Sequence, residues 1–276
     1  RNLSRALFND GSGALGTSSG APSLSGGNTV VTIASMKEAN FEERDLVDLG
    51  TSASKQIEIV EVDPDNSKIT LKGDVQANVP NGTVIYMQGS KDVDPEGLKG
   101  VLDATTGQKY SVDIKRRFKA VQEDAASAGV STDLLNKVML KIKKSCGKSP
   151  NLIVCSFKQY EKILNLLEDH KRYQVNTRAG LKSKSGADIS FSGVEFMSID
   201  GPIGIFPERF IEDDRIYLLN DAHVHIYHRP DFGWFDDDGT VFLRKADSDA
   251  YEARYGGYLQ CYINPNFHGV ITGLST

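Results

Sequence analysis

Polar and hydrophobic residues alternate in short runs over the first part of the chain. Ile57 and Ile59, like Ile69 and Leu71, place apolar side chains on one face of an extended segment, because successive strand residues point to opposite faces. Turn residues interrupt the runs at 63–66 and 80–82. We therefore expect a small β-barrel, with strands at 29–33, 41–47, 56–62, 68–71 and 83–88.

The pattern changes to a helical period between Ser131 and Cys146. Apolar residues three or four positions apart form one face, at Leu134, Leu135, Val138, Met139 and Ile142. Ser131 or Thr132 can cap the first turn, and Gly147 and Pro150 end the helix. Lysines near its end suit the negative end of the helix dipole.

A buried strand at 152–155 and a second amphipathic helix at 157–169 follow, so the chain is predicted to be α+β. Residues 173–185 are polar and basic and read as an exposed loop. Strands are then expected at 189–191, 194–198, 203–206, 215–220, 224–228, 241–245 and 258–263.

The first residues read as the end of a helix, 1–8, stopped by the turn Asn9–Gly13. Residues 17–27 are small, polar and glycine-rich, and are predicted to be a linker. The chain begins at Arg1 without a methionine, which leads us to expect a fragment or a processed product.

Composition excludes several classes of protein. Hydrophobic residues make up 39% and charged residues 25%, as in ordinary globular proteins, and the net charge of -5 argues against a protein that mainly coats nucleic acid. No apolar run is long enough to span a membrane. Three widely spaced cysteines, Cys146, Cys155 and Cys261, form no disulfide framework, so reduced thiols are expected.

Two sequence patterns resemble ligand sites. Residues 11–16 match GxGxxG, but a phosphate site needs a strand before it and a helix after it, whereas here a helix precedes and the predicted linker follows. His223, His225 and His228, with Asp221, could contribute to a zinc site; the alternative of polar residues on an exposed strand is favoured, because His228 falls on the opposite face and a closed site needs four ligands.

Three further patterns have simpler explanations. Asp236–Gly239 lacks the spacing of a calcium loop and reads as a hairpin turn in which Gly239 takes a positive φ. Cys155 lies at a strand end before a helix but has no identifiable base, so it is expected to be a core thiol. The basic residues Arg172, Arg178, Lys182 and Lys184 read as a solvated loop, or as a contact with a neighbouring subunit or DNA. No catalytic, cofactor-binding or metal-binding residue, and no cofactor, is therefore predicted.

The order of segments resembles the major capsid proteins of tailed phages or prophages with the Hong Kong 97 fold. The resemblance rests on the helix end before Asn9–Gly13, the segment 95–101, the helix 131–146 running into 151–156, the strand-to-helix step at 155–160, and the late segments 193–196 and 216–220. No one of these is a diagnostic motif; their order carries the likeness.

The resemblance implies an axial domain, a peripheral domain and an inserted barrel. The implied division is: 1–27, end of the spine helix, glycine turn and linker; 28–94, inserted small β-barrel; 95–150, peripheral domain with the helix 131–146; 151–235, axial domain; 236–276, peripheral sheet and C-terminus. The N-terminal arm, the extended loop and most of the spine helix would precede Arg1, so the chain as given is expected to be N-terminally truncated and a monomer or weak oligomer.

The function that the resemblance implies is a structural head protein that self-assembles into an icosahedral shell around phage DNA, in the virion and, during assembly, in the host cytoplasm. Implied partners are further copies in pentamers and hexamers, scaffolding, portal and maturation protease proteins, and packaged DNA through weak contacts; no membrane is implied. The alternatives are an α+β enzyme and a carbohydrate- or protein-binding module that uses the barrel. The barrel has no tryptophan for a sugar platform, because the only one is Trp234.

Overall fold

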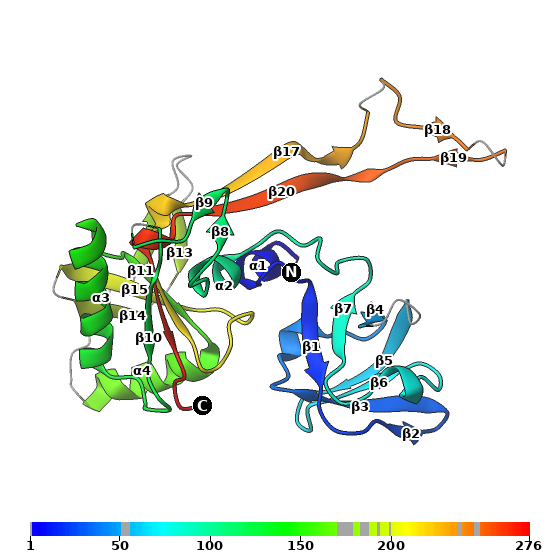
Figure 1. The fold of residues 1–276 in the computed structure, drawn as a ribbon, viewed down its shortest axis with the longest axis horizontal. Coiled ribbons are helices and arrows are strands. Elements are labelled where there is room, and N and C mark those ends of the chain that lie inside the picture. The colour runs from blue at the N-terminus through cyan, green and yellow to red at the C-terminus, as the bar shows by residue number, and fades with distance from the viewer. Residues whose placement is uncertain are drawn as a thin grey trace.

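The computed structural model describes residues 2–276 except 51–55, 117, 170–178, 183–187, 192–193, 199, 237–238 and 246–248. A body of helices and strands, a separate barrel and a long two-stranded projection make up the molecule (Figure 1). The short helix α1 (Asn2–Phe8) and the glycine turn after it lie between the body and the barrel. No helix among the described residues is long and apolar enough to cross a membrane.

Antiparallel strands close the barrel. Their order is β1-β7-β4-β5-β6-β3, and β1 also pairs with β3, so the sheet returns to its first strand, while β2 extends β3 outside the ring. The strands are β1 (Ala14–Ser18), β2 (Ser23–Ser25), β3 (Asn28–Ala34), β4 (Leu46–Leu49), β5 (Ile57–Asp63), β6 (Lys68–Leu71) and β7 (Val84–Met87). Single 3-10 turns, η1 (Glu38–Asn40) and η2 (Gln76–Asn78), connect some of them.

The interior of the barrel is apolar, as the alternation predicts. Ile59, Ile69 and Leu71 are fully buried there. Burial on one face of each strand is what fixes the strand register, because a slip of one residue would expose the whole set.

The prediction of a linker at 17–27 is wrong, because Thr17 and Ser18 belong to β1 and Ser23–Ser25 form β2, which pairs with β3. Thr17 pairs with Ala34 on one side and with Val84 on the other, and Leu15 is only 3% exposed inside the barrel. Small polar residues suffice here because backbone hydrogen bonds to two neighbouring strands hold β1. The strand predicted at 41–47 is also wrong in its first half, since β4 begins at Leu46 and the preceding residues form a turn around the buried Phe41.

The body is built on a six-stranded mixed sheet. Strands β10 and β21 run parallel, as do β11 and β15, and the other neighbours are antiparallel. In spatial order the strands are β10 (Val121–Asp124), β21 (Gly269–Thr272), β16 (Ile216–Leu219), β11 (Leu152–Cys155), β15 (Gly201–Pro207) and β14 (Val194–Ser198).

Two helices cover one face of this sheet. The helices α3 (Thr132–Cys146) and α4 (Phe157–Asp169) have the expected bounds to within one residue. The Ser131 hydroxyl accepts a hydrogen bond from the Leu134 N–H at 3.2 Å, and Gly147 ends α3 with φ +76°. The helix prediction, with its cap and its terminating glycine, is therefore confirmed.

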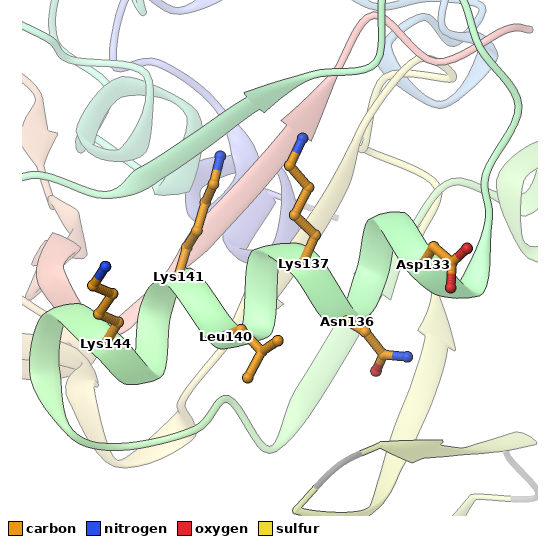
Figure 2. Close-up of a pocket in the computed structure, with 6 residues that line it drawn as sticks. All are labelled: Asp133, Asn136, Lys137, Leu140, Lys141 and Lys144. Carbon is orange, nitrogen blue, oxygen red and sulfur yellow. The ribbon is translucent and has the colours of Figure 1, made fainter.

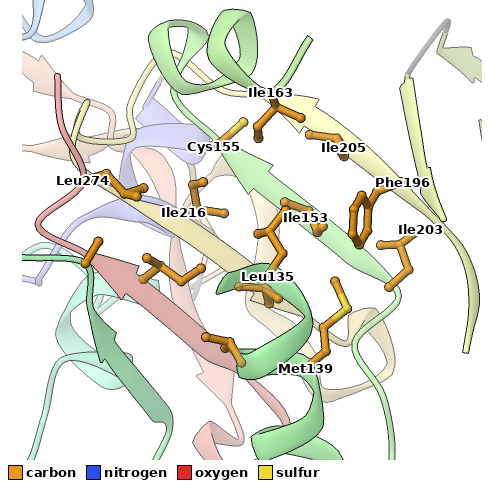
Figure 3. Close-up of a cluster of buried hydrophobic side chains, with 14 of the residues drawn as sticks. Leu135, Met139, Ile153, Cys155, Ile163, Phe196, Ile203, Ile205, Ile216 and Leu274 are labelled. Carbon is orange, nitrogen blue, oxygen red and sulfur yellow. The ribbon is translucent and has the colours of Figure 1, made fainter. Parts of the chain in front are cut away.

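One core under these helices joins distant parts of the chain (Figure 3). Leu135 and Ile142 of α3 pack with Ile153 of β11, Ile216 of β16 and Ile271 of β21. These residues come from three of the predicted segments, 95–150, 151–235 and 236–276. The structure therefore does not separate packing units at residues 150/151 or 235/236, because the central sheet takes strands from both sides of each position.

The opposite face of the sheet is covered by α1, by α2 (Leu98–Leu102) and by the base of the projection. Val154 and Tyr217 point to this side, whereas their neighbours Ile153 and Ile216 point to α3. Gly97 allows α1 and α2 to approach, since a Cβ there would lie 2.4 Å from the Ala6 and Leu7 carbonyl oxygens.

The projection consists of β17 (Val224–Trp234) paired with β20 (Tyr255–Ile263), and we call residues 224–263 the arm. It extends away from the body along one edge of the molecule (Figure 1). The prediction placed only 224–228 and 258–263 in strands, and expected a strand at 241–245 where only β18 (Leu243–Arg244) forms, paired with β19 (Tyr251–Glu252). Two further short pairs are β8 (Gln108–Lys109) with β9 (Val112–Asp113), and β12 (Ala179–Lys182) with β13 (Asp188–Phe191).

Candidate functional site

The glycine-rich stretch 11–16 is a turn followed by a strand. Gly11 and Gly13 have φ of +83° and +75°, and a Cβ on Gly13 would lie 2.1 Å from the Ser90 carbonyl oxygen. Strand β1 follows, so the helix N-terminus that a phosphate site needs is replaced by the first strand of the barrel. The glycines serve the turn and the close passage of two chain segments.

The three candidate histidines are not arranged around a common point. His223 ends the 3-10 turn η3 (Asp221–His223) and stacks on Phe267 at a ring distance of 3.6 Å. His225 lies on β17 between Tyr227 and Tyr262, with ring centroids 6.2 and 6.3 Å away. Among the described residues no three His, Cys, Asp or Glu side chains gather in a way that could hold a metal ion.

The remaining sequence candidates have structural explanations where the structure describes them. Gly239, with φ +80°, donates its N–H to the Asp236 carbonyl at 2.7 Å, which confirms a turn there; Asp237 and Asp238 lie outside the described residues. Cys155 is fully buried, and burial raises the pKa of its thiol to about 12, which confirms a core thiol. Of the basic loop, Arg172, Arg178 and Lys184 lie outside the described residues, as does the side chain of Lys182.

A buried histidine that the sequence reading missed joins the two ends of the arm. His268 is 0% exposed; its Nδ1 accepts a hydrogen bond from the Asn220 N–H at 3.2 Å, and its Nε2 lies 3.5 Å from the His223 carbonyl oxygen. Burial lowers the pKa of His268 to about 4. The ring is therefore neutral at pH 7, which suits an acceptor at Nδ1.

A network of ion pairs fastens the barrel to the body, and no sequence pattern predicts it. Glu212 contacts Lys99 of α2 at 2.7 Å, Arg215 at 2.5 Å, and Lys37 from the barrel at 3.5 Å. Lys37 also donates to the Phe210 carbonyl at 3.4 Å, and Arg215 contacts both oxygens of Asp103 at 2.8 and 2.6 Å.

The charges of this network are interdependent. Burial alone would raise the pKa of Glu212, but Lys37, Lys99 and Arg215 outweigh it and lower the pKa to about 2. Burial lowers the pKa of Lys37, and the nearby Glu212 opposes that change. Glu212 is thus the shared anion of three cations from three separate parts of the chain.

An open groove of about 1710 Å³ runs between the barrel and the body beside this network. Its walls include Lys37, Glu42, Glu43 and Asp214. The groove is broad and carries both signs of charge, which is the character of a contact surface rather than of an enclosed small-molecule site.

The outer face of α3 carries a shallow hollow of about 420 Å³ (Figure 2). Leu140, 50% exposed, lines it together with Lys137 and Lys141, which both bind Glu123 of β10. These hydrogen bonds lower the pKa of Glu123. The two lysines hold α3 against an edge strand of the sheet.

The arm holds the largest exposed apolar side chains of the described part of the chain. Tyr227 and Tyr258 are 60% and 70% exposed on one side of the ribbon, and Trp234 and Tyr255, also exposed, form an edge-to-face pair at 5.2 Å. Two-stranded ribbons are marginally stable in water by themselves, and exposed apolar surface on this scale is typical of interaction sites. The arm is therefore the candidate functional site.

The known proteins to which this chain is similar are phage capsid proteins. The family model of the SU10 major capsid protein matches residues 68–275. Among solved structures the chain is similar to the cyanophage A-1(L) capsid asymmetric unit, at 14% identity and a TM-score of 0.44, over 68% of this chain and 62% of that one. The chain thus spans less than two thirds of that capsid chain, and no curated protein sequence matches it.

The family match covers well over half of the 276 residues, including the whole of the body and the arm. The chain therefore belongs to the SU10 major capsid protein family.

Proposed function

We propose that copies of this chain build an icosahedral phage shell in the Hong Kong 97 manner, as rings of five and six subunits around packaged DNA. Heterologous contacts between identical subunits close into such rings when the rotation between copies permits it. The observation that carries the proposal is the arm, whose exposed aromatic side chains and strand edges are left uncovered by the part of the body that the structure describes.

In this arrangement the six-stranded sheet with α3 and α4 corresponds to the axial domain, and the arm with α1 and α2 to the peripheral domain. The packing of α3 on this sheet supports placing it in the axial rather than the peripheral part. Assembly would take place in the host cytoplasm, with scaffolding, portal and maturation protease proteins as partners and DNA held by weak contacts.

The barrel is proposed to be an insertion displayed on the shell. Its entry and exit lie side by side, since the Asp92 N–H donates to the Ser12 carbonyl at 3.0 Å and the Ser90 hydroxyl lies 3.4 Å from the Gly13 carbonyl oxygen. A segment whose two ends meet can be added to a fold without displacing the rest.

Electron microscopy of particles sedimented from cells that express the capsid gene with its assembly partners tests the shell function. Uniform icosahedral shells are expected. A variant in which a short glycine turn replaces residues 229–254 should give folded subunits without shells, whereas a matched change in the exposed barrel turn at 65–66 should leave the shells intact. Persistent monomers from the unaltered gene would contradict the proposal.

A further inference from the structure

The tip of the arm and the loop at its base carry opposite charges. Residues 234–252, which we call the arm tip, carry six acidic and two basic residues. Residues 108–119, which we call the root loop, carry five basic residues and one acidic residue. The two segments thus have opposite net charges within a chain whose overall charge is only -5.

The root loop is fixed at the base of the arm. The Tyr110 hydroxyl donates to the Cys261 carbonyl at 3.1 Å and accepts from the Ile263 N–H at 3.4 Å, and its ring lies 5.0 Å from that of Tyr262. Burial raises the pKa of Tyr110 to about 12, so it stays a neutral hydroxyl that can make both hydrogen bonds. These contacts hold the root loop against the base of the arm, with Lys115 and Arg116 exposed on it.

The exposed side chains of the root loop and of the arm tip are complementary in charge, and both segments also expose apolar side chains. At the root loop, Lys115 and Arg116 are exposed beside Val112, which is 47% exposed. At the arm tip, Phe242 is 68% exposed and the carboxylate of Asp249 is 96% exposed. Trp234, Tyr251 and Asp236 also lie exposed there. Each end offers apolar surface bordered by charge that is mostly of one sign, negative at the arm tip and positive at the root loop.

A single copy cannot bring these ends together. An 11-residue strand such as β17 extends roughly 36 Å, and β18 and β19 lie at the end of the arm far from β8 and β9 (Figure 1). Exposed ion pairs within each end, Arg244 with Asp249 at 3.6 Å and Lys115 with Asp113 at 3.0 Å, contribute little stability because they are solvated. The complementary surface for each end must come from another molecule.

We infer that the arm tip of one copy docks on the root loop of a neighbouring copy, with Trp234 and Phe242 against the apolar surface of the loop and Asp249 facing Lys115 and Arg116. The contact rests on the proposed shell function only in taking a second copy as the partner. It would cover exposed aromatic side chains of an otherwise isolated ribbon and set the mainly acidic arm tip against the mainly basic root loop.

Charge reversal tests this contact on the full chain. A root-reversed variant carries Lys115→Glu and Arg116→Glu, and a tip-reversed variant carries Asp236→Lys and Asp249→Lys. Sedimentation equilibrium at low salt should show self-association of the unaltered chain, weakened at least about tenfold in each variant because like charges then face each other. Lys144→Glu and Asp65→Lys, exposed on α3 and on the barrel, serve as charge controls and should leave association unchanged.

Mixing the variants provides the decisive measurement. In an equimolar mixture the glutamates at 115 and 116 of one variant can meet the lysines at 236 and 249 of the other, and the unaltered root loop and arm tip can pair as in the native chain. Association should therefore return and should weaken with added salt. An unaltered chain that stays monomeric, variants that associate normally, or a mixture that does not recover would each overturn the inference. Loss of duplex DNA binding by the root-reversed variant with unchanged self-association would overturn it too, in favour of a polyanion site.

The two proposals can fail separately. If both reversed variants still assembled into shells in cells, the docking of arm tip on root loop would be excluded while the shell function stood. If the unaltered gene gave no shells but the reversed variants paired only as a mixture, the docking would stand and the shell proposal would fail.

Discussion

Replacing Glu212 by glutamine removes one negative charge from the network that joins the barrel to the body. Glutamine keeps the size of the side chain and its capacity to accept a hydrogen bond, so the change isolates the charge. Lys37, Lys99 and Arg215 would then lie close together in a partly buried place without their shared anion. We expect the variant to fold with lower stability.

Two estimates of the loss in the free energy of unfolding agree for the Glu212→Gln variant. The carboxylate pKa falls from an ordinary 4.5 to about 2, and this interval corresponds to roughly 3 kcal/mol of preferential stabilisation of the charged form. Removing one partner of a buried ion pair costs about 3–5 kcal/mol, and the side chain of Glu212 is 25% exposed, so the lower end applies. The expected loss at pH 7 is about 2–3 kcal/mol.

The difference between the ordinary and the folded-state pKa of Glu212 also determines how the stability of the protein depends on pH. Because the folded state lowers the pKa of Glu212, its stabilisation is fully present above pH 4.5 and is lost as the pH falls toward about 2. Urea unfolding followed by circular dichroism at pH 7 and pH 3 should therefore show a large gap between native protein and variant at pH 7 and a smaller one at pH 3.

Glu252→Gln provides the matched control, because this carboxylate pairs with Arg254 on the exposed arm and its removal should leave the urea midpoint unchanged. An equal midpoint for Glu212→Gln and the native protein at pH 7 would refute the reasoning. So would a gap at pH 3 as large as the gap at pH 7, since it would show that the charge of Glu212 is not the source of the stability.

Three further predictions concern the body. Ser131→Ala removes the cap of α3 and should cost about 1 kcal/mol in urea unfolding; an unchanged midpoint would show that the cap is dispensable. Ile142→Ala should cost about 2–5 kcal/mol because its side chain is fully buried, whereas Leu140→Ala on the exposed face of the same helix should be nearly neutral, and equal losses would contradict the packing. Since burial lowers the pKa of His268 to about 4, unfolding stability should fall as the pH drops from 6.5 toward 4, by up to about 1.4 kcal/mol per pH unit, and a His268→Gln variant should lose this slope between pH 6.5 and 4.5.

Local patterns in the sequence determined much of the secondary structure. The spacing of Leu135, Val138 and Ile142 with Ser131 and Gly147 fixed α3 nearly to the residue, because periodicity, capping and termination depend on neighbours within a few positions. The same holds for the strand at 152–155 and for Cys155, whose apolar neighbours indicated a core thiol. The order of such elements also indicated the capsid family.

Strand pairing and packing between residues far apart in sequence determined the remaining features of the fold. Thr17 belongs to a strand because β3 and β7 lie on either side of it, and nothing in its own small, polar neighbourhood indicates this. Helix α3 joins the same core as Ile216 and Ile271 because the sheet takes its strands from both sides of each predicted boundary.

In the candidate site, too, some features follow from the sequence alone and others depend on the tertiary structure. Composition determined that the chain offers no evident catalytic chemistry and carries opposite charges in the root loop and the arm tip. Only the tertiary structure decided that Lys37, Lys99 and Arg215 share Glu212, that His268 joins the two ends of the arm, and that the arm stands apart with its aromatic side chains exposed. Such contacts join residues far apart in sequence, so they depend on how the whole chain packs rather than on any local pattern.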